Sequence, residues 1–119
     1  MKNKKILITG ASGFVGTNLV EELNTRGYSN LLTPSSKELN MTNEESVSNY
    51  FSTNKPQVVL HIAGLVGGIA ANKSKPGDFF HQNAMMSVLV NHYSYINGVE
   101  KLVYLYLLMK MIFGMVYLI

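Results

Sequence analysis

The sequence predicts an α/β fold, a doubly wound parallel sheet with helices on both of its faces. Short apolar runs such as KKILITG and PQVVLHIAG alternate with longer segments in which apolar residues recur at helical spacing. A chain of 119 residues has room for one small domain, so these elements belong to a single sheet. Alternation of this kind is typical of parallel strands joined by crossover helices.

The first strand and the first helix lie on either side of a glycine-rich turn. The β-branched and apolar run over residues 4–10 predicts a buried strand. A helix is expected over residues 14–27, and Gly27 stands where the carboxyl-terminal cap of that helix belongs. The apolar residues of this helix share one face: Val15, Leu19, Val20 and Leu23.

A second strand and a second helix follow. The strand, residues 30–34, is short and is stopped by Pro34. Thr42, followed three residues later by Glu45, predicts a capping box that opens a helix over residues 42–52. The apolar residues of that helix are Val47, Tyr50 and Phe51.

The third strand, the longest helix and the fourth strand complete the pattern. Pro56 introduces a strand that runs to Gly64, and a helix is expected over residues 76–94. Gly98 ends that helix, and a fourth strand starts with EKLVYL. The apolar residues of this helix recur near helical spacing: Phe79, Phe80, Met86, Val90 and Tyr93.

Several residues of ligand-binding type are expected to serve the core instead. His61 ends an apolar strand, so we interpret it as a core or strand-end histidine and not as a catalyst. The helix residues Phe79, Phe80, Met85 and Met86 are likewise interpreted as core residues.

The charge and the cysteine content of the chain restrict the kinds of partner and the cellular compartment that we expect. The formal net charge of +3 matches the excess supplied by Lys2, Lys4 and Lys5 near the amino terminus. There is no basic stripe with interleaved aromatic residues, so we expect no nucleic-acid partner. The absence of cysteine excludes disulfides and fits a reducing compartment, so we expect a cytoplasmic protein without a metal site. The apolar stretch before Gly10 is too short for a signal peptide.

The segment ITGASGFVG carries the most specific chemistry in the chain. Gly10 permits a tight turn, Gly13 lets the backbone approach a pyrophosphate, and Gly16 lets the helix pack close to the strand. The phosphates would then bind at the helix amino terminus, where unpaired N–H groups and the helix dipole favour an anion. The position of this loop between a strand and a helix favours a dinucleotide site over a turn without a ligand.

The residues after the second strand bear on the choice between NAD and NADP. NAD-binding proteins place an acidic residue there for the ribose 2′-hydroxyl, but the second strand here ends without Asp or Glu. Ser35, Ser36 and Lys37 could hold a 2′-phosphate instead, which favours NADP. The alternative is that these residues form an ordinary solvated loop.

A second segment, HIAGLVGGIAANKSKPGDFFHQNAMM over residues 61–86, points to one family. Together with the glycine loop and with KELNMTN, it resembles the extended short-chain dehydrogenase/reductase family and, within it, the GDP-L-fucose synthases (GDP-4-keto-6-deoxymannose epimerase-reductases). The resemblance runs from about Lys4 to Leu105 and is distinctive at Val66–Asn72 and Pro76–Asn83. It implies that residues 1–105 form a Rossmann-like NADP-binding portion, truncated after about four strands.

The resemblance also implies roles for individual residues. The loop residues Gly10, Ala11, Ser12, Gly13, Phe14, Val15 and Gly16 would hold the cofactor pyrophosphate of NADP(H). Ser36 and Lys37 would lie near the 2′-phosphate, Asn40 near the adenine, and Ile62, Ala63 and Gly64 beneath the cofactor. The GDP-sugar substrate would meet Val66, Gly67, Gly68, Ile69 and Asn72. Intact relatives are expected to be homodimers without a membrane segment.

The tail over residues 106–119 departs from the family, which continues after the fourth strand with Gly-Ser-Ser, where this chain has Tyr106. Tyr106 and Lys110 match the catalytic Tyr-x-x-x-Lys spacing, but we interpret this match as coincidental. In a continuing strand these positions would lie about 13 Å apart, too far for Lys to lower the pKa of Tyr. The catalytic residues are therefore not assigned.

The tail has two other interpretations, a membrane span and the product of a shifted reading frame. Its length and low charge approach those of a membrane span, but Lys110 at the centre opposes insertion. Shifted by one frame, the codons for Met109–Leu118 are compatible with a family stretch, Glu-x-Asp-Phe-Trp-Asn-Gly-Tyr-Pro, except at its Tyr. The favoured hypothesis is a frame change with a short deletion, or a misread exon boundary.

The resemblance implies an NADP-dependent enzyme that converts GDP-4-keto-6-deoxy-D-mannose to GDP-L-fucose by epimerisation at C3 and C5 and reduction at C4. This chain is expected to be an amino-terminal fragment without turnover. Two alternatives stay open: a non-catalytic NAD(P)-binding module and a related NAD-dependent nucleotide-sugar epimerase or dehydratase.

Overall fold

A computed structural model describes residues 2–62 and 76–104, with the side chains of residues 76–80 left out of the description. The elements follow the predicted order: β1 (Ile6–Thr9), α1 (Phe14–Thr25), β2 (Leu31–Leu32), α2 (Glu44–Asn54), β3 (Val58–His61), α4 (Pro76–Ile96) and β4 (Lys101–Tyr104). The strands pair in the order β2-β1-β3-β4, and all three pairings are parallel. The predicted parallel α/β sheet is confirmed.

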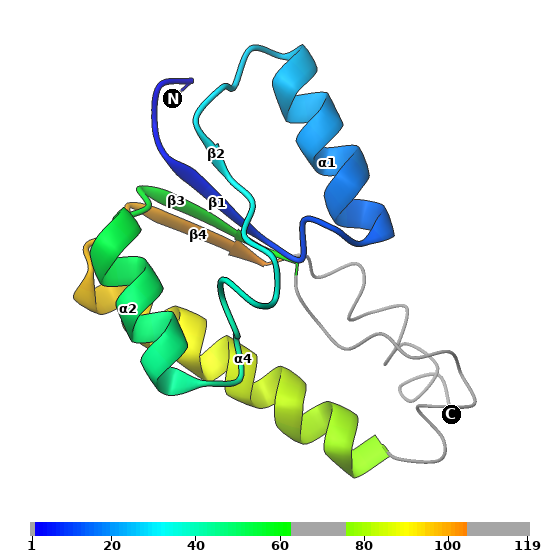
Figure 1. Ribbon diagram of the computed structural model, residues 1–119, viewed down its shortest axis with the longest axis vertical. Coiled ribbons are helices and arrows are strands. Elements are labelled where there is room, and N and C mark those ends of the chain that lie inside the picture. Colours follow the sequence, from blue (N-terminus) through cyan, green and yellow to red (C-terminus); the bar gives the residue numbers. More distant parts are fainter. Residues whose placement is uncertain (1, 63–75, 105–119) are drawn as a thin grey trace.

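The sheet lies between helices on both faces, with α1 on one side and α2 and α4 on the other (Figure 1). The alternation of side chains along β1 explains this arrangement, because successive residues of a strand point to opposite faces. Ile6 and Ile8 belong to a cluster with the apolar face of α1, whereas Leu7 belongs to a cluster with α2 and α4. A continuous apolar run is what a strand buried on both faces requires.

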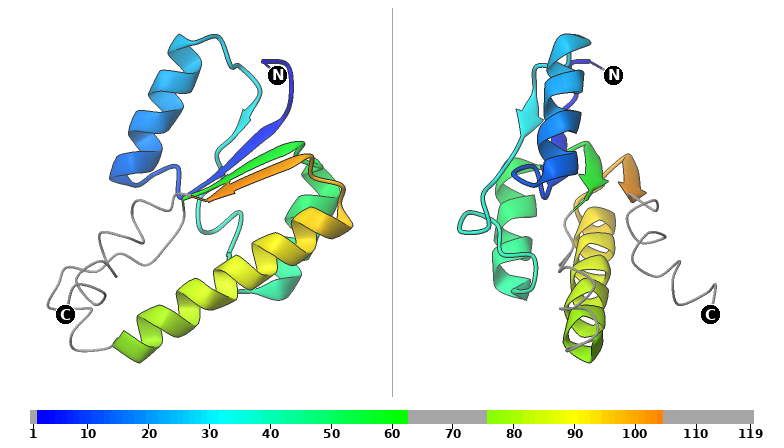
Figure 2. Two further views of the ribbon diagram at one scale, coloured as in Figure 1. Left: turned by 180° about the vertical axis from the view of Figure 1, so that it is seen from behind. Right: turned by 90° about the vertical axis from the view of Figure 1, so that its right-hand side faces the viewer.

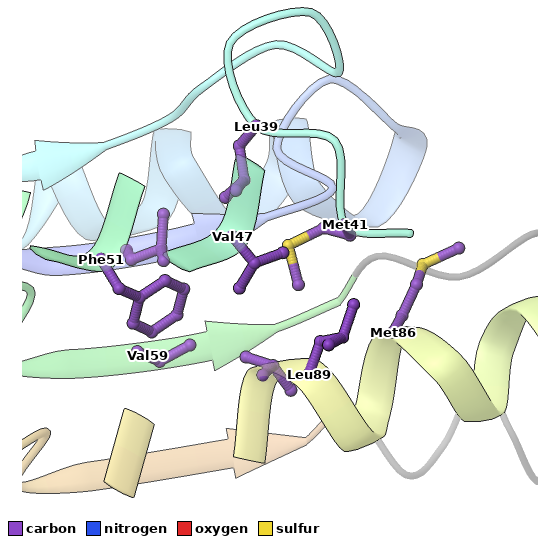
Figure 3. Close-up of a cluster of buried hydrophobic side chains, with 9 residues drawn as sticks. Leu39, Met41, Val47, Phe51, Val59, Met86 and Leu89 are labelled. Atoms are coloured by element: carbon purple, nitrogen blue, oxygen red, sulfur yellow. The ribbon is translucent and has the colours of Figure 1, made fainter. Parts of the chain in front are cut away.

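The larger cluster packs α2 and α4 against the sheet (Figure 3). Val47 and Phe51 of α2 are fully buried there, and Leu89 and Val90 reach it from α4. Its buried members are Leu7, Leu39, Met41, Val47, Phe51, Val59, Met86, Leu89 and Val90. The expected core role of Met86 is confirmed, but that of Met85 is wrong, because Met85 is 37% exposed.

The helix ends confirm two predictions and correct one. Gly27 and Gly98 adopt φ of 91° and 71° just beyond α1 and α4, as left-handed caps require. The predicted Thr42–Glu45 capping box is wrong: α2 is capped by Asn43, whose side chain accepts from the Ser46 N–H. The Thr42 hydroxyl instead donates to Asn40 Oδ1 at 2.8 Å, so it does not cap the helix.

Several predictions fall outside the described residues. They concern the side chains of Phe79 and Phe80, the family segment over residues 63–75, and the tail with Tyr106 and Lys110. The boundary expected between residues 105 and 106 lies there as well. Within residues 2–62 and 76–104, no helix has the length and apolar character needed to cross a membrane.

Candidate functional site

A cavity of about 810 Å³ opens at the carboxyl ends of the strands, next to the glycine loop. Figure 2 shows β1, β3 and β4 ending at the same edge of the sheet, as parallel strands must. Ligands of open parallel sheets bind at this edge, where neighbouring strands connect to opposite faces. The cavity is lined by Thr9, Gly10, Ser12, Gly13, Phe14, Val15, Gly16, Pro34, Ser36, Leu39, Asn40, Met41, Thr42, Ile62, Gln82 and Met86.

The glycine loop has the geometry that its sequence predicts. Gly10 adopts φ of 74°, which side-chain-bearing residues rarely take, and its carbonyl accepts from the Gly13 N–H at 3.2 Å. A Cβ on Gly16 would lie 2.0 Å from the Gly10 oxygen, so only glycine fits there. Gly13 caps α1 without a side-chain hydrogen bond. The first turn of α1 therefore offers its backbone N–H groups and the positive end of the helix dipole to an anion.

The loop after β2 forms the opposite wall of the cavity. Ser35 and Glu38 cap each other: the Ser35 N–H donates to Glu38 Oε1 at 3.2 Å, and the Glu38 N–H donates to Ser35 Oγ at 3.3 Å. This exchange occupies the Glu38 carboxylate within the loop, while Ser36 lines the cavity. Lys37 is exposed and is not part of the lining. Within the described part of the chain, the cavity lining contains no acidic side chain.

Asn40 is oriented by Thr42. The Thr42 N–H and the Thr42 hydroxyl both donate to Asn40 Oδ1, at 3.1 and 2.8 Å. A backbone N–H can only donate, so the bonded atom must be the oxygen of the Asn40 amide. The other end of the Asn40 amide is therefore Nδ2, which carries two N–H donors, and Asn40 lines the cavity. The geometry suits a ligand with ring nitrogen or carbonyl acceptors.

His61 is a buried histidine, as expected. It is 5% exposed, and its Nδ1 lies 2.7 Å from Thr9 Oγ1, within hydrogen-bonding distance. The Tyr104 ring meets it edge to face at 5.4 Å. Burial lowers the pKa of His61 from its usual 6.5 to about 4, because the surroundings disfavour the charged ring. His61 is therefore neutral at physiological pH and does not line the cavity.

The lowered pKa of His61 predicts acid sensitivity. The unfolded chain takes up this proton near pH 6.5 and the folded chain only near pH 4, so stability falls as the pH drops between these values. We expect the free energy of unfolding to be about 2 kcal/mol lower at pH 5 than at pH 7 because of this group. Urea unfolding at both pH values measures it.

Two variants separate His61 from other titrating groups. His61→Asn removes the ionisable ring, so the acid loss should shrink. His92→Asn replaces an exposed histidine and should keep the loss of the wild type. If the free energy of unfolding fell equally between pH 7 and pH 5 in the wild type and both variants, the role of His61 would be contradicted.

The structure brings together most of the predicted cofactor residues that it describes. Nine of them line the cavity: Gly10, Ser12, Gly13, Phe14, Val15, Gly16, Ser36, Asn40 and Ile62. Ala11 and Lys37 are described but do not line it. The last two predicted cofactor residues, Ala63 and Gly64, lie outside the described residues, as do the five predicted substrate residues, Val66, Gly67, Gly68, Ile69 and Asn72.

Other lining residues were missed by sequence reasoning. Gln82 and Met86 come from α4, where their i, i+4 spacing puts them on one face, and this spacing was the available signal. For Thr9 the signal is its place directly before Gly10, at the end of the first strand. For Leu39, Met41 and Thr42 the signal is their place in KELNMTN, beside the predicted cofactor residue Asn40. Among the described residues, no group of His, Cys, Asp or Glu side chains could hold a metal ion.

Comparison with known proteins decides the family. The sequence model of the NAD dependent epimerase/dehydratase family matches residues 6–106. The chain belongs to this family. Its members include relatives that act on sugars linked to nucleotides, as the names of the similar proteins indicate.

The relatives that this chain is similar to include proteins named GDP-L-fucose synthase. A putative GDP-L-fucose synthase 2 from Arabidopsis thaliana is 38% identical over 104 residues, which cover 87% of this chain and 32% of the relative. A GDP-L-fucose synthase from Azorhizobium caulinodans is 43% identical over 89 residues, covering 75% of this chain and 28% of the relative. The chain thus spans about a third of the length of these relatives.

The fold of this chain is also similar to that of a solved structure. The GDP-mannoheptose C4 reductase from Campylobacter jejuni, determined with NADP bound, superposes with a TM-score of 0.82 at 40% identity. The match covers 87% of this chain and 33% of the reductase. The family, and the similarity to GDP-L-fucose synthases, are therefore as the sequence predicted.

Proposed function

We propose that this chain is the NADP(H)-binding portion of an epimerase/dehydratase family enzyme that acts on a GDP-linked keto sugar. One observation carries the proposal: a cavity at the carboxyl ends of parallel strands is walled by a glycine loop, by the amino terminus of α1 and by a loop without an acidic lining residue. The similar reductase with NADP bound supports the choice of cofactor.

The cofactor would lie across the strand ends, with its pyrophosphate on the Gly10–Gly16 loop and the first turn of α1. Its adenosine would lie beyond β2, near Ser36 and Asn40. Lys37 would reach the 2′-phosphate from the rim, because its long side chain can extend toward the anion. Ile62, Ala63 and Gly64 would lie beneath the nicotinamide half.

The preference for NADP over NAD rests on charge. An NAD site needs a carboxylate for the 2′-hydroxyl, whereas Glu38 is occupied by Ser35 and lies outside the lining. A 2′-phosphate would then meet Lys37 without opposition from a lining carboxylate.

Replacing Lys37 should test this preference. We expect Lys37→Gln to weaken NADPH binding roughly five- to tenfold, about 1 to 1.4 kcal/mol, because one charge-assisted contact is lost at an exposed site. NADH binding should be unchanged, since NADH lacks the 2′-phosphate. Fluorescence titration of both cofactors measures the two dissociation constants.

Lys55 provides the matched control. It is exposed and precedes β3, so it lies at the opposite end of the sheet from the cavity. Lys55→Gln should leave both dissociation constants unchanged. An equal loss of NADPH affinity in both variants would indicate a general charge effect and contradict a 2′-phosphate role for Lys37.

The reaction of the whole enzyme would be that of GDP-L-fucose synthases: epimerisation of GDP-4-keto-6-deoxy-D-mannose at C3 and C5, then reduction at C4 with NADPH. Val66, Gly67, Gly68, Ile69 and Asn72 would approach this sugar nucleotide. The family's Ser and Tyr-x-x-x-Lys, which serve proton transfer in the reduction, have no assigned match in this chain. We therefore propose that the chain binds cofactor without turning it over.

A turnover assay tests this part. The 119-residue chain is mixed with NADPH and the keto-sugar nucleotide, and absorbance of the reduced nicotinamide is followed. We expect binding of NADPH without its oxidation. Oxidation at an enzymatic rate would contradict the proposal and would reopen a catalytic role for Tyr106 and Lys110.

A further inference from the structure

A buried pair of polar side chains joins the ends of β1 and β3 beside the cavity. Thr9 and His61 are the last residues of these strands and are register partners in the parallel pair. Thr9 Oγ1 and His61 Nδ1 lie 2.7 Å apart, and the two residues are 2% and 5% exposed. A hydrogen bond in such a dry environment is strong, and losing one partner is costly. The pair therefore fixes the two strand ends relative to each other.

Thr9 transmits this restraint to the backbone that borders the cavity. The Ile62 N–H lies 3.2 Å from the Thr9 carbonyl oxygen and 3.1 Å from Thr9 Oγ1, so it donates to both. Thr9, Gly10 and Ile62 line the cavity, whereas His61 does not. Among the described residues, His61 can therefore influence a ligand through its hydrogen bond to Thr9 and through the backbone at Ile62, to which it is directly bonded.

The His61 ring is also held from its other side. The Tyr104 ring packs on it edge to face at 5.4 Å, and the Tyr104 hydroxyl donates to the Ser87 carbonyl oxygen of α4 at 3.4 Å. Burial alone accounts for the lowered pKa of His61, and burial also raises the pKa of Tyr104. Both rings are thus neutral near pH 7, and His61 adds no charge that could attract a phosphate.

We propose that His61 is a positioning residue for the cofactor. His61 holds the Thr9 hydroxyl against the Ile62 amide, and this contact sets the spacing between the glycine loop and the end of β3. This inference rests on the proposed function of the cavity. This spacing should affect the affinity for the pyrophosphate and nicotinamide half of NADPH, because that half must pass from the Gly10 loop toward Ile62. The adenosine half would meet the loop after β2, which His61 does not contact.

Two substitutions at His61 separate hydrogen bonding from bulk. His61→Leu keeps an apolar side chain between Thr9 and Tyr104 but removes the ring nitrogen. His61→Asn keeps a hydrogen-bonding atom near the position of Nδ1. The full 119-residue chain and both variants are titrated with NADPH by fluorescence, and with adenosine 2′-phosphate by NMR.

We expect His61→Leu to weaken NADPH binding roughly tenfold, the effect of one lost hydrogen bond in a buried network. Binding of adenosine 2′-phosphate should stay within about twofold, because this ligand probes only the adenosine end. His61→Asn should recover most of the NADPH affinity. The ratio of wild-type to His61→Leu affinity should not change with salt, since no charge is altered.

Coupling to Thr9 provides a further readout. In a Thr9→Val background, His61→Leu should have little additional effect, because the bond is already absent. Additive losses would overturn the inference, as would equal NADPH affinity in wild type and His61→Leu. Parallel losses for NADPH and adenosine 2′-phosphate would show a general defect of folding and would overturn it too. Failure of the wild type to bind NADPH would instead overturn the proposed function on which the inference rests.

Discussion

Gly16→Ala is expected to destabilise the glycine loop and to abolish cofactor binding. A Cβ at this position would lie 2.0 Å from the Gly10 oxygen and 2.7 Å from the Ala11 Cα. Both neighbours are backbone atoms, so the loop and the start of α1 would have to separate. Overpacking typically costs about 1–3 kcal/mol, and we expect a loss at the upper end of this range because both neighbours are backbone atoms. Thermal unfolding and NADPH titration of the variant would measure the two losses.

Gly13→Ala is the matched control for this prediction. Among the described residues, a Cβ on Gly13 would meet only the Gly10 oxygen, at 3.5 Å, which is an ordinary contact. Gly13 also has φ of −76°, which alanine adopts without strain. We expect stability near that of the wild type and a smaller loss of affinity, through crowding of the pyrophosphate. Equal destabilisation by both substitutions would contradict the proposed packing of α1 on the loop.

Phe51→Ala is expected to cause the largest loss of stability among single changes in the core. Phe51 has 0% exposure, and its side chain extends from α2 toward Val59 of β3 in the larger cluster (Figure 3). Removing its ring leaves a cavity that the packed neighbours fill only in part, at a cost of about 3–5 kcal/mol. That is a large share of the stability of a small domain, so much of the variant should be unfolded. Urea unfolding followed by circular dichroism measures the change.

Two comparisons support the interpretation of this loss. Phe51→Leu keeps most of the apolar volume and should cost less than half as much as Phe51→Ala. Tyr95→Ala removes a similar ring at a position that is 86% exposed, and should change stability by no more than about 0.5 kcal/mol. A similar loss in Tyr95→Ala and Phe51→Ala would contradict the assignment of the core.

The order of elements could be predicted because each has a local cause. Apolar runs mark strands that are buried on both faces, as Ile6, Leu7 and Ile8 are. Gly27 and Gly98 mark the ends of α1 and α4, because left-handed backbone disfavours residues with a side chain. The cap of α2 could not be predicted in this way. Thr42 and Asn43 are both good capping residues, and the choice depends on Asn40, which binds Thr42.

The candidate site was predictable only where its chemistry is local. The glycine loop is contiguous in sequence, so its turn and its anion site follow from spacing alone. The Thr9–His61 pair joins residues 52 positions apart, and only the register of β1 against β3 brings them together. Gln82 and Met86 reach the cavity through the placement of α4 on the sheet. Such contacts depend on tertiary packing, which no local pattern encodes.

The most direct test of the central claim is a calorimetric titration of the 119-residue chain with NADPH and, separately, with NADH at the same salt concentration. The cavity at the strand ends predicts that one NADPH molecule binds per chain. The absence of an acidic side chain from the described cavity lining, with Lys37 nearby, predicts that NADPH binds roughly tenfold more tightly than NADH or better. The reason is that only NADPH presents a 2′-phosphate to the loop after β2. Equal affinity for the two cofactors, tighter binding of NADH, or no binding of either would contradict the account.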